Sequence, residues 1–113
     1  MIDKLTVNKP WGNFEQITLN TQTTVKILTV NPNSRLSYQD HQKRDEFWKC
    51  IKNSVSVSID GNSRILYEGD EVFIPKGSKH RLAGLDKEGK VLEVSFGHFD
   101  ENDIVRYEDD YGR

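Results

Sequence analysis

The sequence predicts an all-β protein whose short strands pack as an antiparallel sandwich or barrel. Short runs of β-branched and aromatic residues recur along the chain, with turn signals between them at intervals of about 8–12 residues. No segment keeps a helical spacing of apolar residues over several turns. A length of 113 residues is typical of one domain, so we expect residues 1–113 to form a single small domain.

The clearest expected strand is SVSVSID, in which Val55, Val57 and Ile59 alternate with serines and should share one buried face. All the expected strands are 23–30, 46–52, 54–60, 63–67, 71–75 and 91–96. The stretches NPNS, DGN, EGD, PKGS and DKEGK are typical of the turns between them. Residues 100–107 predict one short helix, with Asp100 as its N-cap and Asp103 three residues later.

Composition argues against several classes of partner. A net charge of −2 and scattered basic residues give no reason to expect binding to nucleic acid or to a membrane. We find no apolar run that fits a signal peptide or a membrane span, and no glycine-rich nucleotide loop. Cys50 is the only cysteine, which excludes an intrachain disulfide. We therefore expect a cytoplasmic protein that does not transfer nucleotides.

Four side chains could converge as a metal site. If residues 39–41 are extended, Gln39 and His41 point to the same face, and Glu46 opens the next strand. A tight turn at PKG would deliver His80. One Gln, two His and one Glu form a nitrogen and oxygen set suited to zinc, iron, manganese or nickel. The alternative, hydrogen-bonded structural histidines and a solvated glutamate, stays open on residue types alone.

Two spacing patterns resemble the motifs of the cupin superfamily, G-x5-H-x-H-x3–4-E-x6-G and G-x5-P-x-G-x2-H-x3-N. The second appears as Gly69-x5-Pro75-x-Gly77-x2-His80, and its last position is Gly84. The first appears as Asn33-x5-Gln39-x-His41-x4-Glu46-x6-Asn53. Asparagine replaces both motif glycines, and we expect it to adopt the left-handed conformation that glycine supplies. The resemblance implies a jelly-roll barrel, a single cupin domain over residues 1–113.

Flanking segments resemble the type II mannose-6-phosphate isomerases, a family that also supplies the C-terminal domain of bifunctional mannose-1-phosphate guanylyltransferases. The matching segments are KPWGNFE, LSYQ, RDEFW, IPKGSKHRL and DIVRYEDDYGR. The resemblance implies a divalent metal ion, zinc first and manganese, iron, nickel or cobalt otherwise, held by Gln39, His41, Glu46 and His80. In a competing register the ligand pair is 41 and 43, and Lys43 would then abolish the site.

The reaction implied is interconversion of mannose 6-phosphate and fructose 6-phosphate through a cis-enediol. Lys43 and Glu93 are the candidate bases, each with a surface role as the alternative. Arg81, Arg106 and Arg113 are candidates to act on the substrate and its phosphate, because a guanidinium matches a phosphate dianion.

The alternatives are a non-catalytic sugar-binding or regulatory cupin, and another cupin enzyme such as an oxygenase or a sugar epimerase. We expect Trp11 and Tyr111 to anchor the chain ends on the barrel. We also expect a homodimer that pairs through edge strands.

Overall fold

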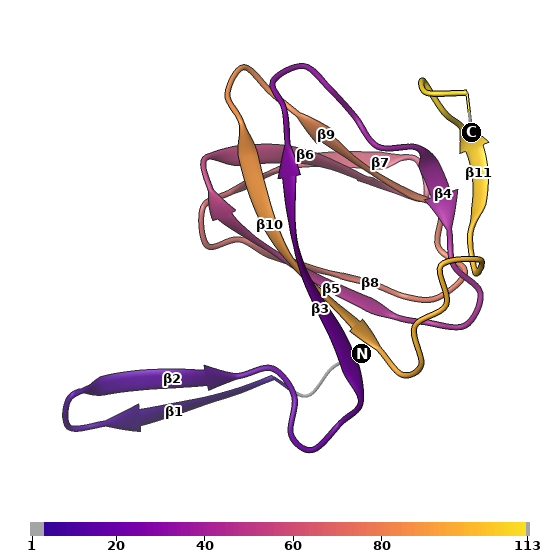
Figure 1. Ribbon diagram of the computed structural model, residues 1–113. Coiled ribbons are helices and arrows are strands. Elements are labelled where there is room, and N and C mark those ends of the chain that lie inside the picture. Colours follow the sequence, from indigo (N-terminus) through magenta and orange to yellow (C-terminus); the bar gives the residue numbers. More distant parts are fainter. Residues whose placement is uncertain (1–3, 113) are drawn as a thin grey trace.

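The computed structural model describes residues 4–112, which form eleven β-strands and no helix (Figure 1). A four-stranded sheet has the order β3-β10-β5-β8, and a five-stranded sheet has the order β11-β4-β9-β6-β7. Strands β1 and β2 form a separate hairpin. The bounds are β1 Leu5–Lys9, β2 Gly12–Gln16, β3 Thr23–Val30, β4 Tyr38–Asp40, β5 Glu46–Lys52 and β6 Ser54–Ile59. The remaining strands are β7 Asn62–Tyr67, β8 Glu71–Ile74, β9 His80–Gly84, β10 Gly89–Phe96 and β11 Val105–Glu108.

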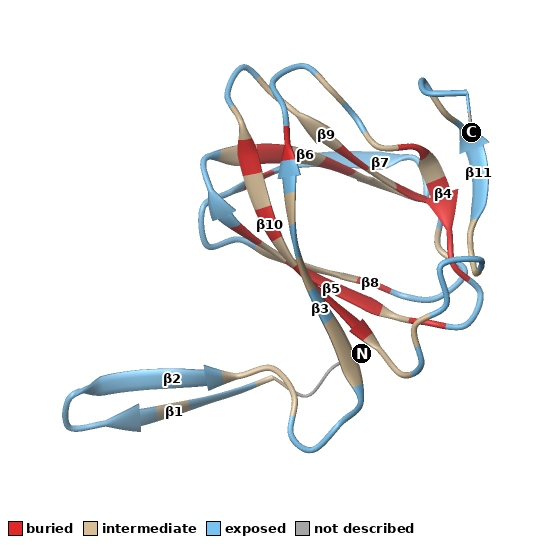
Figure 2. Cartoon of the chain, viewed as in Figure 1, coloured by how far each residue is buried: buried red, intermediate tan, exposed pale blue. Residues whose placement is uncertain are grey.

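The two larger sheets face each other and form the barrel, with buried residues on their inner faces (Figure 2). The expected alternation in β6 is confirmed, because Val55 and Val57 are fully buried and Ile59 packs against the same core. Cys50 is also part of that core, as expected for a small apolar side chain. These contacts make the apolar interior that holds the strands in place.

One end of the barrel interior is apolar and the other end is polar. Along β5, the inward positions run from Cys50 through Trp48 to Glu46. Their partners on β10 run from Val91 through Glu93 to Ser95. Because inward side chains on paired strands lie side by side, the polar ends of both strands meet. The fold therefore collects buried polar groups at one mouth of the barrel.

Asparagines occupy two tight turns, as the motif spacing predicts. Asn33 has φ 57° and Asn53 has φ 54°, both in the left-handed region. Gly77 also has a positive φ, and its N–H donates to the carbonyl oxygen of His41 at 2.7 Å. This bond fixes the turn before His80 against the segment that carries His41.

The predicted helix at 100–107 is wrong. The Asp100 side-chain carboxylate accepts a hydrogen bond from the backbone N–H of Asn102 at 2.9 Å. The backbone carbonyl oxygen of Asp100 accepts one from the N–H of Asp103, so the expected helix cap closes a turn instead. Strand β11 follows and pairs antiparallel with β4. Val105 and Tyr107 alternate along this segment and favour a strand, because β4 offers an edge with which it can pair.

The β1–β2 hairpin projects away from the barrel (Figure 1). Trp11 lies in its turn and is 73% exposed, so the expectation that Trp11 anchors the chain on the barrel is wrong. The hydroxyl of Tyr111 does bond to the carbonyl oxygen of Arg35 at 2.8 Å. Residues 4–112 contain no helix long and apolar enough to cross a bilayer.

Candidate metal centre

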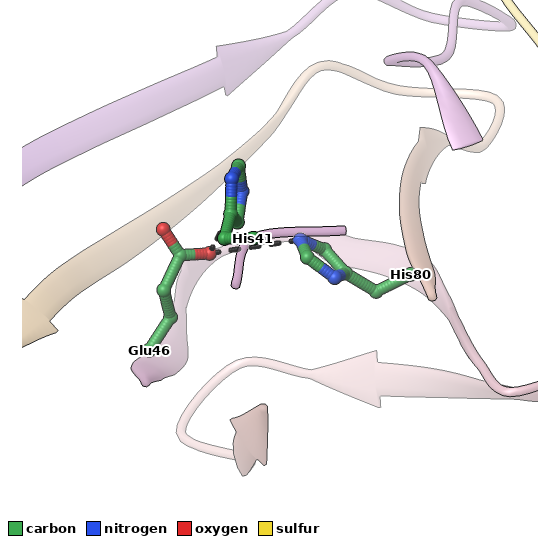
Figure 3. A group of neighbouring side chains, drawn as sticks. All are labelled: His41, Glu46 and His80. Carbon is green, nitrogen blue, oxygen red and sulfur yellow. Dashed lines mark ion pairs between the residues drawn. The ribbon is translucent and has the colours of Figure 1, made fainter. Parts of the chain in front are cut away.

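Three of the expected ligands converge at the polar mouth of the barrel (Figure 3). His41 follows β4, Glu46 begins β5 and His80 begins β9. One ligand atom from each lies within 4.8 Å of the other two. The Oε1 atom of Glu46 is 3.8 Å from Nε2 of His41 and 3.6 Å from Nε2 of His80. All three side chains are buried, so water competes poorly for the position between them.

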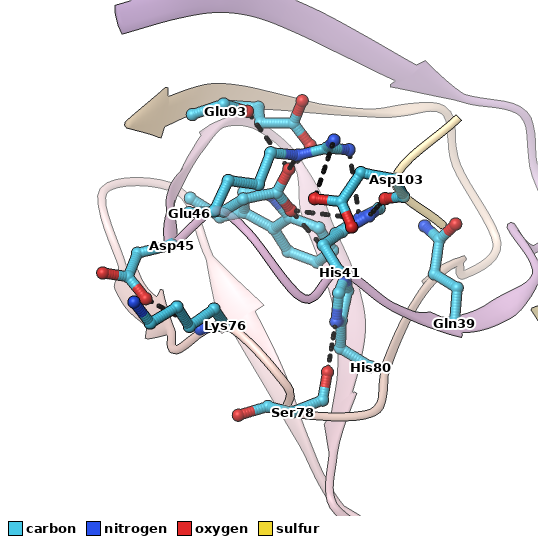
Figure 4. A network of polar contacts seen from close by, with 12 residues as sticks. Gln39, His41, Asp45, Glu46, Lys76, Ser78, His80, Glu93 and Asp103 are labelled. Carbon is cyan, nitrogen blue, oxygen red and sulfur yellow. Dashed lines mark hydrogen bonds and ion pairs between the residues drawn. The ribbon is translucent and has the colours of Figure 1, made fainter. Parts of the chain in front are cut away.

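Backbone carbonyls orient both imidazoles (Figure 4). Nδ1 of His41 lies 2.7 Å from the carbonyl oxygen of Asp103, and Nδ1 of His80 lies 2.9 Å from that of Ser78. A carbonyl oxygen only accepts, so each Nδ1 must carry the proton and donate it. Each Nε2 is then left with a lone pair that faces the Glu46 carboxylate. Histidines that bind a metal through one ring nitrogen typically donate a hydrogen bond of this kind from the other ring nitrogen.

Two buried atoms at the centre have no hydrogen-bond partner among the described residues, Oε1 of Glu46 and Nε2 of His80. Their separation of 3.6 Å is too long for a hydrogen bond. Burial lowers the pKa of His80, which keeps this imidazole neutral, with its lone pair free. An unpaired buried acceptor costs free energy, and a cation placed between these atoms would satisfy them. The residues present therefore fit a divalent metal ion.

Gln39 lies on the inner face of β4, on the same sheet face as His80. The two residues are direct cross-strand partners, and the Gln39 side chain is buried. Its Oε1 accepts from the hydroxyl of Ser37 at 3.2 Å, which leaves that oxygen one further lone pair. Figure 4 shows Gln39 beside His80. A ligand role for Gln39 stays a prediction.

The loop 41–45 bears on the choice between the two registers. Lys43 is exposed, and its backbone N–H donates to the Asp103 carboxylate at 3.1 Å. His41 is in the cluster, whereas Lys43 faces solvent. This placement favours the register that starts at Gln39 and leaves Lys43 away from the cluster.

Glu93 is buried next to the cluster and accepts a hydrogen bond from Nε1 of Trp48 at 3.1 Å. Burial, and next the negative charge of Glu46, raises the pKa of Glu93 to about 7. The carboxyl group therefore exchanges its proton near neutral pH. Of the two candidate bases, Glu93 faces the interior.

The three candidate arginines lie in different places. Arg81 follows His80 on β9 and points outward, where it binds Glu108 and the carbonyl oxygen of Leu36. Arg106 is exposed, but it is the cross-strand partner of Gln39 in the pairing of β11 with β4. It therefore lies on the same sheet face as Gln39, the inner face, at the rim of the barrel. Arg113 lies outside the described residues.

Sequence reasoning missed Arg44, which is only 7% exposed. Its Nε donates to Oε2 of Glu46 at 3.1 Å, and its Nη2 lies 3.3 Å from Nε2 of His41. Because that Nε2 is an acceptor, Arg44 donates to it and uses the lone pair that a metal would take. The signal was present, since Arg44 opens the family-like segment RDEFW.

Lys26 was also missed. It lies on β3 directly opposite Glu93, and its Nζ is 4.1 Å from the centroid of the Phe99 ring. The Arg44 guanidinium is 4.4 Å from the same centroid. Two cations therefore share one aromatic ring at the barrel mouth.

Comparison with known proteins identifies the family. The family model described as mannose-6-phosphate isomerase C-terminal matches residues 2–109. The chain belongs to this family. The match covers nearly the whole chain and includes the segments that carry His41, Glu46 and His80.

Relatives in this family are longer. The chain is 37% identical over 112 residues to mannose-1-phosphate guanylyltransferase of Escherichia coli (strain K12), covering 95% of this chain and 23% of the relative. It is 38% identical over 109 residues to the alginate biosynthesis protein AlgA of Pseudomonas aeruginosa, with the same coverage of 95% and 23%. The chain thus spans about a quarter of the length of these relatives.

Solved structures confirm the cupin fold. A sugar phosphate isomerase of the cupin superfamily from Silicibacter pomeroyi matches with a TM-score of 0.65 and 16% identity, covering 80% of this chain and 70% of that one. Oxalate decarboxylase from Bacillus subtilis matches with a TM-score of 0.68 and 26% identity, covering 77% of this chain and 24% of that one. This member of the isomerase C-terminal family is therefore a cupin, as its motif spacings predict.

Proposed function

We propose that this cupin is a metal-dependent sugar-phosphate isomerase that interconverts mannose 6-phosphate and fructose 6-phosphate. The observation that carries the proposal is the cluster of His41, Glu46 and His80, with two buried atoms that lack partners, in a family named for this isomerase. Fold alone would not support it, because cupins of one shape carry many activities.

The metal-holding residues are His41, Glu46 and His80, with Gln39 as the fourth ligand. Two imidazoles, a carboxylate and an amide suit zinc, and they also suit manganese, iron, nickel or cobalt. A bound divalent ion supplies a Lewis acid that polarises the oxygens of the substrate. The protein contributes a dry position and fixed imidazole orientations, both of which strengthen that effect.

Glu93 is the proposed base. As the ionised carboxylate, it takes the proton from C2 of mannose 6-phosphate to give the cis-enediol. It then delivers that proton to C1, while the hydroxyl proton of O2 moves to O1, which gives the ketose. A carboxyl group with a pKa of about 7 can both accept and release a proton at neutral pH. Lys26 and Arg44 favour the ionised form of Glu93, because both cations lie near it.

The phosphate site is proposed at the rim, where Arg106 shares the inner sheet face with Gln39. A planar guanidinium can bind two phosphate oxygens at once. Arg113 is the second proposed phosphate ligand.

Metal analysis and a coupled assay test the proposal together. Purified wild-type protein should contain about one divalent ion per chain, and His80→Ala should lose it. The wild type should convert mannose 6-phosphate, but not ribose or glucose phosphates used as controls. Glu93→Gln should keep the metal and lose about 10²–10⁴-fold in turnover. Full turnover by metal-free protein would refute the metal-dependent mechanism.

Arg44 supports a second candidate, a sugar-phosphate-binding cupin without metal or turnover. Its guanidinium already satisfies Nε2 of His41 and Oε2 of Glu46. In that case the wild type would bind mannose 6-phosphate in calorimetry with no metal and no conversion. The metal content of the wild type separates the two candidates.

A further inference from the structure

The loop that carries His41 is bound by one residue from a distant part of the chain, Asp103 (Figure 4). The backbone carbonyl oxygen of Asp103 lies 2.7 Å from Nδ1 of His41. Its carboxylate accepts the backbone N–H groups of the next two residues, with Oδ1 3.0 Å from the nitrogen of Gln42 and Oδ2 3.1 Å from that of Lys43. The Asp103 side chain is only 8% exposed. A single buried side chain and its own carbonyl thus bind three consecutive residues of the loop.

These bonds hold a segment that has no strand partner of its own. Residues 41–45 connect β4 to β5 and lie in no strand. The two ends of the loop are fixed by the β8–β9 turn, which bonds to the carbonyl oxygen of His41 and to the carboxylate of Asp45. Hydrogen bonds from backbone N–H groups to an ionised carboxylate are roughly twice as strong as neutral ones. Asp103 therefore fixes the middle of the loop.

The two imidazoles of the cluster differ in where their acceptor comes from. His80 donates to the carbonyl oxygen of Ser78, two residues earlier in the same turn. His41 donates to Asp103, 62 residues later in the sequence. The orientation of His80 is therefore built into its own turn, whereas the orientation of His41 depends on how Asp103 is held. The carboxylate of Asp103 is bonded to the loop itself, which keeps the loop and the carbonyl oxygen in one fixed arrangement.

We propose that Asp103 is the positioning residue of the metal centre. Its carboxylate locks the loop, and this lock holds its own carbonyl oxygen against Nδ1 of His41, so that Nε2 faces Glu46. Asp103 acts through His41 and is not itself a ligand. The inference rests on the metal centre of the proposed function, but it does not depend on which sugar phosphate is converted.

Nitrogen-15 NMR of the metal-free protein tests the proposal without any reaction. The chain has three histidines, His41, His80 and His98, so each ring can be followed separately. At a pH of about 8, where a free imidazole is neutral, wild-type His41 should show the Nδ1–H tautomer with a slowly exchanging ring proton. Asp103→Ala should give mixed tautomers at His41 and at least ~10-fold faster exchange of that proton, because the ring loses its fixed acceptor. His80 should be unchanged in the same variant.

Zinc affinity, measured by competition with a chromophoric chelator, gives the second readout. Asp103→Ala should weaken zinc binding about 10–100-fold, the usual effect of losing a contact that orients a metal-binding histidine. Asp103→Asn keeps one acceptor oxygen and should fall between the wild type and the alanine variant. The matched control is Asp70→Ala, which removes a carboxylate bonded to the backbone N–H of Tyr67 at 2.9 Å in the turn between β7 and β8. It should leave zinc affinity and both imidazoles of the cluster unchanged.

The outcomes separate this inference from the isomerase proposal. Circular dichroism must show the wild-type strand content, and if Asp103→Ala does not fold, the comparison of Asp103→Asn with the wild type decides. A wild-type tautomer at His41 together with wild-type zinc affinity overturns the inference and leaves the isomerase intact. Equal changes at His41 and His80 also overturn it, because they indicate general loosening. A wild type that binds zinc without converting mannose 6-phosphate loses the isomerase alone, and one that binds no zinc loses both.

Discussion

At the scale of single residues, the identity of the hydrogen-bond partner at each histidine Nδ1 determines what the site can bind. The carbonyl oxygens of Asp103 and Ser78 fix the protons of both imidazoles on Nδ1. The lone pairs on Nε2 therefore point inward. Had either partner been a donor, the same residues would have formed a plain hydrogen-bond network.

Arg44→Met should destabilise the metal-free protein by about 3 kcal/mol, because it leaves the buried Glu46 carboxylate without its cation. Added zinc should raise the melting temperature of the variant by more than that of the wild type, since the metal replaces the lost charge. Arg35→Met, which breaks an exposed pair with Asp110, is the control and should cost less than ~1 kcal/mol. Equal zinc shifts in wild type and Arg44→Met would contradict this role.

Glu93 should make the stability of the metal-free protein depend on pH. Its folded-state pKa is about 7, above the ordinary value of 4.5, so the folded protein holds a proton that the unfolded chain has released. Stability should therefore fall as pH rises from about 5 to 8, by about 2–3 kcal/mol more in the wild type than in Glu93→Gln. Urea denaturation at both pH values measures the difference. Parallel pH profiles would show that Glu93 does not titrate in this range.

The sequence predicted the cluster residues whose spacing matches the cupin motifs, and it missed two cations beside them, Arg44 and Lys26. His41 and Glu46 flank one loop, and His80 follows a turn with a required glycine, so their spacing could be matched to the cupin motifs. Lys26 enters from a distant strand, and only the register of β3 against β10 places it opposite Glu93. Arg81 faces outward because it is the neighbour of an inward His80, which strand alternation could have indicated.

At the scale of elements, six of the eleven strands among residues 4–112 were predicted, because the residue pattern of those six reports burial directly. The predicted helix failed because Asp100 carries the same capping chemistry in a turn as at a helix start. The hairpin at 5–16 was not expected, since its strands are short and largely exposed and their pattern carries little burial signal.

Asn33 provides the test of the turn geometry. Asn33→Ala should destabilise the protein by about 1 kcal/mol, because an alanine at φ 57° is strained. Asn33→Gly should be neutral within a few tenths of a kcal/mol, since glycine adopts this conformation freely. Urea denaturation of the two variants gives the comparison. An alanine variant as stable as the glycine variant would mean that the turn is not held in the left-handed region.

At the scale of the whole molecule, the barrel interior has an apolar end and a polar end. The apolar end carries the core around Val55 and Leu82, while the polar end carries buried groups that cost stability without a ligand. The strand pattern predicts the barrel, and the motif spacing predicts that His41, Glu46 and His80 come together. The projecting hairpin and the outer face of β3 belong to a separate, external surface.

Anomalous diffraction from zinc-grown crystals tests the central claim most directly. The account predicts one strong peak inside the barrel, about 2.0–2.2 Å from Nε2 of both histidines and from the Glu46 carboxylate. Arg44 should then have left Nε2 of His41. A barrel with no peak, with Arg44 still bonded to His41, would contradict the assignment of this cluster as a metal centre.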